Sequence, residues 1–279
     1  MRPDDHPEND DSLLLGDSDH CKFQMLIGML NWVVTIGRLD MAYATASLSC
    51  FLACPREGHL QRALHVFGYL KQHKNRRIAM YSKQPNFKKC EGKFEKDSQA
   101  ALKDNYPNVA EEIDKQCPAP CYAELPITAF VDLDHGHDHM TRCSITGLVI
   151  LVGRTPIVFS SKRQGTVATL TFGAGFCALQ TSTEEITAVQ YMLRCLGVQV
   201  KVPSTVFCNN LGVVQNATIP KSILKKKHMT LAYHAVREAA AAGIIQPIKI
   251  LGRNNIANVL TKLLPKDLFN CLTNLVFHG

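Results

Sequence analysis

Short apolar strand patterns and longer helical patterns alternate along the chain from residue 127 onward. This alternation constrains the fold most, because strands must join a sheet and the helices between them must cover its faces. The predicted strands are 127–134, 144–153, 155–161, 204–210 and 244–251. The predicted helices are about 173–197, 211–217, 225–242 and 255–263. The sequence therefore predicts a mixed α/β domain of five strands and intervening helices at about 126–264.

Residues 21–83 predict a small helical region before this domain. Apolar residues recur at helical spacing at 22–36, 40–52 and 58–72. A strand pattern follows at 78–82. Trp32 is the only tryptophan and lies in the first of these helices, which favours packing in the core.

Three further segments have weaker patterns. Residues 1–20 predict an acidic, disordered leader. Residues 84–125 are polar and contain Pro85, Pro107, Pro118 and Pro120, so they predict a linker with one short helix near 97–103. Residues 265–279 predict a C-terminal helix or tail.

The charge of the chain is unevenly distributed. The net charge is +7, but the first twenty residues hold seven acidic residues and one basic residue. The remaining chain therefore carries +13, which is compatible with a polyanionic partner such as nucleic acid. A solvated lysine face is the alternative explanation of the same excess.

The cysteines and the apolar runs predict an intracellular chain, in the cytoplasm or the nucleus. The 11 cysteines have irregular spacing and form no CxxC pair, so we expect reduced thiols and no zinc site at Cys117 and Cys121. No signal peptide is visible, and no apolar run approaches the ~18 residues that span a bilayer, so no membrane association is predicted.

Two acidic residues end the first predicted strand of the α/β domain. Asp132 and Asp134 are two residues apart, so their side chains share one face of the strand and are candidates to hold a divalent metal. A cap on the following turn is the structural alternative. The next residues read HGHDH, from His135 to His139, and a solvated turn explains these histidines better than a metal site does.

Seven blocks follow one another in a characteristic order: FVDLDHGHDHMTRCSITG, TPIVFSSKRQ, TFGAGFCAL, FCNN, ILKKKH, YHAVREA and NNIANVLTK. Together they resemble the ribonuclease H region of copia-type retrotransposon polyproteins. Residues 23–71 resemble the segment between the polymerase and ribonuclease H regions of the same polyproteins. The polymerase motif, an apolar residue and Tyr before paired Asp, is absent from the sequence. We therefore expect the tail of a polyprotein, starting downstream of that motif.

The resemblance implies a ribonuclease-H-like α/β fold, a five-stranded mixed sheet with flanking helices, and hydrolysis of RNA in RNA–DNA hybrids. In the intact family four carboxylates hold two Mg²⁺ ions, which activate a water and stabilise the leaving oxygen. Asp132 matches the first carboxylate, but the other three positions hold Gly175, Asn209 and Asn258. Glu184 lies nine residues after Gly175, about 13 Å along a helix, which is too far to replace the missing side chain.

These losses predict an inactive, degenerate site, because Asp132, with Asp134, offers at most two negative charges to two divalent ions. We expect Mg²⁺ to bind weakly at best and no cofactor to bind well. Mutational drift explains the losses better than adaptation of a retained binding surface. The alternatives are an active nuclease with a displaced acid set, an interaction module without a nucleic-acid role, and a poorly folding pseudogene product. The displaced set comprises Asp132, Asp134, Asp138 and Glu184.

Two basic clusters predict residual, weak binding to an RNA–DNA hybrid or other nucleic acid, without sequence specificity. The first comprises Lys162 and Arg163, after the third strand, and the second comprises Lys225, Lys226, Lys227 and Arg237. Such side chains contact phosphates rather than bases. His228 lies between the third and fourth carboxylate positions, where the resemblance implies a helper histidine. A solvated face is the alternative for each cluster.

Overall fold

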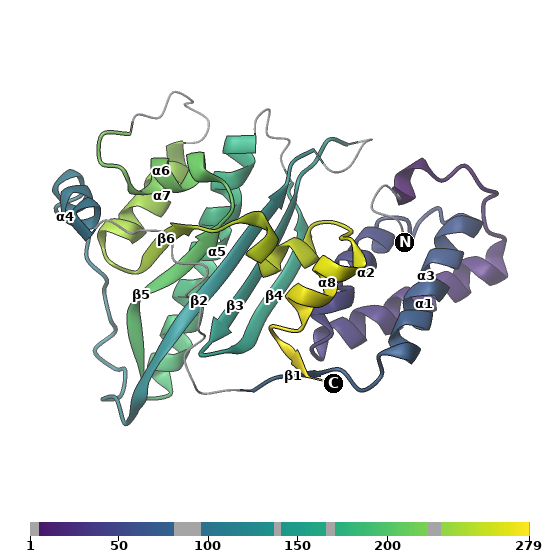
Figure 1. The fold of residues 1–279 in the computed structure, drawn as a ribbon, viewed down its shortest axis with the longest axis horizontal. Helices are drawn as coiled ribbons and strands as arrows, with labels where there is room; N and C mark the ends of the chain where they lie inside the picture. The colour runs from purple at the N-terminus through teal and green to yellow at the C-terminus, as the bar shows by residue number, and fades with distance from the viewer. Residues whose placement is uncertain (1–5, 81–95, 137–140, 166–170, 223–229, 279) are drawn as a thin grey trace.

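A five-stranded mixed sheet forms the centre of the molecule (Figure 1). The computed structural model describes residues 6–80, 96–136, 141–165, 171–222 and 230–278. The strand order is β4-β3-β2-β5-β6, in which β2, β3 and β4 are antiparallel neighbours and β5 and β6 continue parallel to β2. The strands are β2 (Tyr122–Asp134), β3 (Ile145–Val152), β4 (Thr155–Arg163), β5 (Val198–Cys208) and β6 (Ile245–Lys249). The predicted α/β fold class is confirmed.

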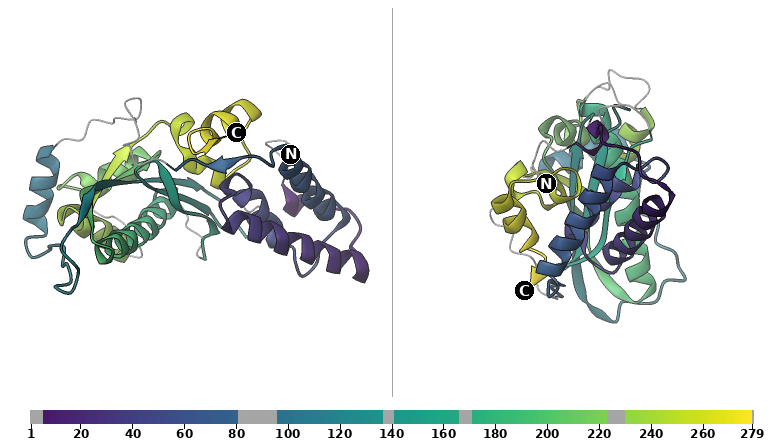
Figure 2. Two further views of the ribbon diagram at one scale, coloured as in Figure 1. Left: turned by 90° about the horizontal axis from the view of Figure 1, so that it is seen from below. Right: turned by 90° about the vertical axis from the view of Figure 1, so that its right-hand side faces the viewer.

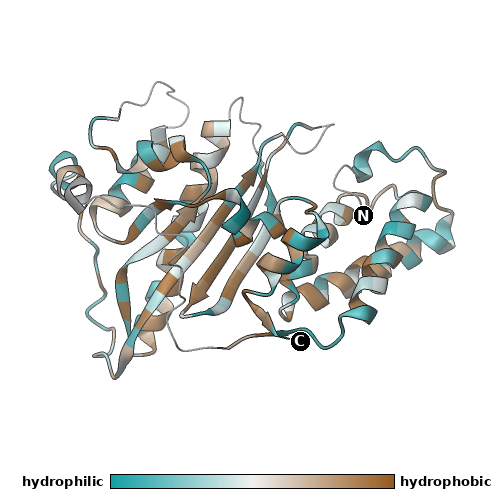
Figure 3. Cartoon of the chain, in the orientation of Figure 1, coloured by the Kyte–Doolittle hydropathy of each residue, from teal (hydrophilic) through white to brown (hydrophobic). Residues whose placement is uncertain are grey.

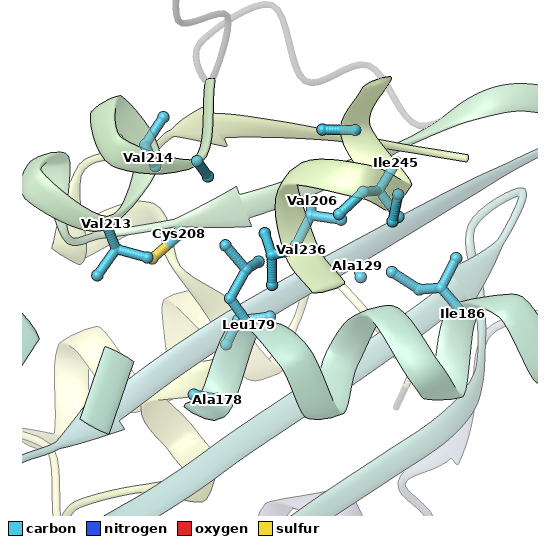
Figure 4. Packing of buried hydrophobic residues seen from close by; sticks show 14 of the residues in the cluster. Ala129, Ala178, Leu179, Ile186, Val206, Cys208, Val213, Val214, Val236 and Ile245 are labelled. Carbon is cyan, nitrogen blue, oxygen red and sulfur yellow. The ribbon is translucent and has the colours of Figure 1, made fainter. Parts of the chain in front are cut away.

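One face of the sheet is covered by three helices: α5 (Thr171–Cys195), α6 (Leu211–Thr218) and α7 (Thr230–Ala241). Alternate residues of β2 point to this face, so Ala129 and Val131 pack with Leu179 and Val236 (Figure 4). Figure 3 shows the apolar residues that run along the central strands. This face forms the larger core, and it places α5 beside the end of β2.

The opposite face of the sheet is covered by short segments from both ends of the chain. Phe130 and Phe207 on this face pack with Leu39 of the 3-10 helix η2 (Leu39–Met41) and with Leu260 of the 3-10 helix η5 (Ile256–Leu260). The C-terminal helix α8 (Lys266–Thr273) follows η5 along the chain. Because Asp132 is two residues after Phe130 in β2, its side chain lies on this second face, toward η5.

The helical region lies beside β4 and contains the three predicted helices: α1 (Asp17–Thr35), α2 (Ala42–Ser49) and α3 (Glu57–Gln72). It extends away from one edge of the sheet (Figure 2). Its own core is built around Phe23, Ile27 and Leu30 of α1. The prediction that Trp32 packs in the core is wrong, because α1 buries the stripe through Phe23 and Ile27 and leaves Trp32 65% exposed.

Residues 6–20 of the acidic leader are held against the helical region, contrary to the predicted disorder. Pro7 is buried, and its carbonyl receives a hydrogen bond of 2.9 Å from Nε2 of His59. The Asp10 carboxylate forms an ion pair with Arg62 of α3. Composition predicted a solvated acidic segment, whereas His59 and Arg62 of α3 hold it at Pro7 and Asp10.

Part of the predicted linker also belongs to the folded domain. Helix α4 (Lys96–Asn105) contributes Leu102, which is 1% exposed, to the core beneath α7. The Asn105 side chain donates a hydrogen bond of 2.9 Å to the carbonyl of Pro220. The segment after α4 then reaches β2, which begins at residue 122.

The C-terminal segment joins the helical region to the sheet domain. Strand β7 (Phe277–His278) pairs antiparallel with β1 (Arg77–Ile78). Of the predicted strand at 78–82, only Ile78 belongs to β1 among the described residues, which end at residue 80 in this segment. The Arg76 guanidinium donates a hydrogen bond of 3.2 Å to Thr273 of α8. None of the helices in the described ranges has the length and apolarity needed to span a bilayer.

Candidate active site

Asp132 lies on the central strand β2 and is 1% exposed. It is paired with Gly147 of β3, which in turn is paired with Ser161 of β4, so these residues form one row across three strands. A Cβ atom at Gly147 would lie 2.7 Å from the carbonyl oxygen of Ala257. The glycine therefore lets η5 approach the sheet closely, which places the residues at the end of η5 against Asp132.

Both carboxylate oxygens of Asp132 receive hydrogen bonds. Asn209 donates from Nδ2 to Oδ1 at 2.5 Å, and Thr261 donates from its hydroxyl to Oδ2. The Lys262 ammonium lies 3.3 Å from Oδ2. The one retained carboxylate is therefore surrounded by donors and is paired with a positive charge.

The end of β5 supplies Asn209, at the third of the expected carboxylate positions. The Asn209 carbonyl receives a hydrogen bond from the Lys249 ammonium. The next residue, Asn210, caps α6, and its Oδ1 accepts from the backbone N–H of Val213 at 3.2 Å. This cap fixes the turn after β5 and so fixes the side chain that contacts Asp132.

Gly175 is buried in the first turns of α5 and lies beside α6. A Cβ atom there would lie 2.6 Å from Cγ2 of Val213 and 3.8 Å from Nδ2 of Asn210. The space beside Gly175 is therefore filled by an apolar side chain. A longer residue at this position requires Val213 to move.

Asn258 lies in η5 and is 4% exposed, but its side chain is used locally. Its Nδ2 donates to the carbonyl of Gly252 at 2.5 Å, and its Oδ1 has no hydrogen-bond partner among the described residues. The segment that carries the fourth expected position thus brings Thr261 and Lys262 to Asp132. Sequence reasoning missed both roles, although the two residues belong to the quoted block NNIANVLTK.

The structure places the other metal candidates as follows. Asp134 ends β2 two residues after Asp132, opposite Ile145, and is partly buried. His137, Asp138 and His139 lie outside the described residues. Burial raises the pKa of the nearby Cys208 thiol to about 11, so it stays protonated near neutral pH and is a poor metal ligand. Within the described ranges, no group of three or more His, Cys, Asp and Glu side chains could hold a metal ion.

The basic candidates have different positions. Lys162 and Arg163 are exposed at the end of β4, one row and two rows beyond the row of Asp132. The prediction that Arg237 contacts phosphates is wrong, because it is 2% exposed and donates to the carbonyls of Asn216, Ile219 and Pro220. The remaining candidates, Lys225, Lys226, Lys227 and His228, fall in a segment outside the described residues.

No protein-family model matches the chain. The chain is similar to retrovirus-related Pol polyproteins of two Arabidopsis thaliana transposons. It is 23% identical to that of RE1 over 252 residues, which is 90% of this chain, and 27% identical to that of RE2 over 145 residues. These matches span only 14% and 10% of the two polyproteins. The predicted resemblance to retrotransposon Pol polyproteins is confirmed.

Two solved ribonuclease H structures are similar to part of the chain. The N-terminal ribonuclease H domain of a Mycobacterium tuberculosis protein is 11% identical, with 54% of this chain and 97% of that chain covered and a TM-score of 0.38. LC11 ribonuclease H1 in complex with an RNA/DNA hybrid is 15% identical, with 46% of this chain and 88% of that chain covered and a TM-score of 0.36.

Proposed function

We infer that this chain, which is similar along most of its length to copia-type retrotransposon Pol polyproteins, is a ribonuclease-H-like protein that has lost hydrolysis and retains weak nucleic-acid binding. The ancestral activity in this proposal is the hydrolysis of RNA in an RNA–DNA hybrid. The retained binding is directed at phosphates and has no sequence specificity.

The surroundings of Asp132 carry the proposal that catalysis is lost. Asn209 and Thr261 occupy both of its oxygens, and the Lys262 ammonium already neutralises its charge. Two divalent ions bring four positive charges and require several hard, anionic oxygen ligands. The described residues do not fit such a pair of ions, so no hydrolytic step through Mg²⁺ can be derived for this chain.

The loss of carboxylates also changes the electrostatics in favour of phosphate. Lys262 is 36% exposed beside Asp132, and Lys249 contacts the adjacent Asn209. Arg163 lies two residues beyond Ser161, on the face of the sheet that carries Asp132, and two strand spacings amount to about 10 Å. A nucleic-acid backbone along this edge of the sheet would therefore meet positive side chains without the acidic ones of the intact family.

A cleavage assay tests the loss of catalysis. The full chain is incubated with a labelled RNA–DNA hybrid and Mg²⁺ or Mn²⁺, and we expect no cleavage above the level of a heat-denatured sample. Metal-dependent cleavage that disappears in Asp132→Asn but persists in Asp267→Asn, an exposed position on α8, would overturn the inactive assignment. That result would favour the displaced acid set.

A salt titration tests the binding surface. We expect hybrid binding to weaken as salt rises, and the slope of log K against log salt to fall by roughly 1 for each phosphate contact removed. Arg163→Ala and Lys262→Ala should each reduce the slope. Lys201→Ala is the matched control, because Lys201 is exposed and pairs with Pro126, toward the opposite end of β2 from Asp132. Equal effects of all three variants would exclude a localised surface.

A further inference from the structure

The segment between α4 and β2 is held against the C-terminal end of α5 at two points. The Glu111 carboxylate forms two hydrogen bonds with the Arg194 guanidinium, at 2.5 and 3.0 Å. Further along, the backbone N–H of Cys121 donates to the carbonyl of Gly197 at 2.8 Å. These two contacts bracket Cys117 on one segment and Cys195 on the other.

Gly197 forms the turn that ends α5 beneath this segment. Its φ is +72°, a conformation that favours glycine, and a Cβ atom there would make ordinary contacts of 3.7 Å with the carbonyl oxygen of Ala119 and 3.8 Å with Sγ of Cys121. The contact between Cys121 and Gly197 is made by backbone groups and does not depend on long, adaptable side chains.

Two cysteine side chains meet between these contacts. The side chains of Cys117 and Cys195 are neighbours, and Tyr191 is a second neighbour of Cys195. Both cysteines are free thiols; Cys195 is exposed and Cys117 is partly exposed. Partial burial and the neighbouring Cys195 thiol raise the pKa of Cys117.

We propose that Cys117 and Cys195 form a reversible intramolecular disulfide that fastens the segment before β2 to the end of α5. The oxidant is a low-molecular-weight disulfide. One cysteine thiolate attacks it, forming a mixed disulfide and releasing one small thiol. The second cysteine thiolate then attacks the mixed disulfide and releases the second small thiol. Two protein thiols are oxidised and one small disulfide is reduced to two thiols, so electrons and protons balance.

Neighbouring cysteines are less suited to this exchange. Cys121 is only four residues from Cys117, but its thiol donates to the carbonyl of Ala119 at 3.2 Å. Cys208 is buried, and burial raises the pKa of its thiol to about 11. Thiol exchange requires an accessible thiolate, which favours the pair at the end of α5.

The disulfide would close a loop of roughly 80 residues that includes β2, β3, β4 and α5. A link of this length removes freedom from the unfolded chain, so the oxidised protein should unfold at a higher temperature than the reduced protein. An increase of about 4 °C or more is expected. A reducing agent should reverse it.

Peptide mapping under non-reducing conditions tests the proposal. The folded chain is incubated with oxidised glutathione at pH 8, quenched with acid, alkylated and digested with trypsin. Cys195 then lies alone on residues 195–201, and Cys117 shares residues 116–142 with Cys121. We expect these two peptides to be joined, with fragmentation placing the bond at Cys117. The joined species should be lost in Cys117→Ser and Cys195→Ser and kept in the matched control Cys121→Ser.

Three results would overturn the proposal. One is recovery of Cys195 only as a glutathione adduct or as the free thiol. Another is a bond from Cys195 to Cys121 that persists in Cys117→Ser. The third is a joined species that appears only after denaturation, since this would show that the folded chain does not bring the two thiols together.

Discussion

Two buried aspartates, Asp132 and Asp40, are neutralised by basic side chains in different ways. Asp132 on β2 has one ammonium partner, Lys262, which follows η5 and has a side chain that is 36% exposed. In the helical region, Asp40 receives two hydrogen bonds from Arg38, at 2.9 and 2.8 Å, and one from the Tyr69 hydroxyl at 2.7 Å. Arg76 lies 3.6 Å from the same carboxylate.

The difference separates a carboxylate that the fold requires from one that it tolerates. Around Asp40 the charged partners are themselves buried, so none can return to water when the pair is broken. Around Asp132 the ammonium reaches solvent, and the other partners are neutral. We infer that the Asp40 cluster holds η2 and α3 together, whereas Asp132 persists without a structural requirement for its charge.

The largest effect should come from Asp40→Asn. This change removes the negative charge and leaves Arg38 and Arg76 buried without compensation, so unfolding should become easier by about 3–5 kcal/mol. Chemical denaturation by urea measures the change. A loss below about 1 kcal/mol would remove the contrast between the two aspartates.

The next effect should come from rebuilding the four-carboxylate site. The variant combines Gly175→Glu, Asn209→Asp and Asn258→Asp with Val213→Ala, which clears the position where a Cβ atom would collide. Without metal, the added charges should destabilise the fold. Mg²⁺ at 100 times its Kd should then restore about 2.7 kcal/mol.

The native chain and Val213→Ala alone are the controls for the rebuilt site. Neither should respond to Mg²⁺ in thermal unfolding. A rebuilt chain that also ignores Mg²⁺ would show that these positions do not converge on Asp132 closely enough to share a metal.

A smaller effect is expected for Asp132→Asn. The amide keeps the shape, and Lys262 can turn toward solvent, so the loss should be about 1 kcal/mol or less. The same urea titration places this value beside that of Asp40→Asn. A loss as large as that of Asp40→Asn would make Asp132 a structural residue and weaken the view that it remains from a metal site.

The smallest effect concerns Asp10, a third paired carboxylate. Burial acts to raise its pKa, but hydrogen bonds from Ser12 and Arg62 outweigh it, and the pKa lies below the ordinary value. The pairing therefore stabilises the folded state at neutral pH, and this contribution is lost as the pH falls below about 4. Thermal unfolding between pH 6 and pH 2 should show a shallower acid dependence in Asp10→Asn. An identical pH dependence of unfolding in the native chain and in Asp10→Asn would show that the Asp10 pairing does not stabilise the folded state.

The spacing of apolar residues predicted the helices and strands because it is a local property of the sequence. The five strands and the helices of the sheet domain occur in the expected order, since alternation and helical spacing report burial directly. However, β2 and β5 begin five and six residues earlier than predicted, and the last helix is the 3-10 helix η5. Periodicity could not predict which face of α1 is buried, because that depends on α3 and η2. Trp32 is exposed for this reason.

The candidate site was predictable only in part. The resemblance picked out Asp132 and Asn209, which are in contact. The roles of Thr261 and Lys262 depend on how closely η5 approaches β3, and Gly147 sets that distance from more than 100 residues away in the sequence. Arg237 was grouped with the lysines at 225–227 because they fall in one predicted helix. It is buried because it donates hydrogen bonds to backbone carbonyls at the end of α6, and the sequence does not reveal these contacts.

The pairing of β1 with β7 has a consequence for the order of synthesis. It joins Arg77 to His278, and Leu39 packs in the same cluster as Val276 and Phe277. A ribosome makes the helical region before the segment that covers it. The helices must therefore wait, with apolar surface uncovered, until residues 276–278 have been synthesised. Truncation of the chain before Val276 would leave the sheet largely intact but deprive the helical region of these contacts.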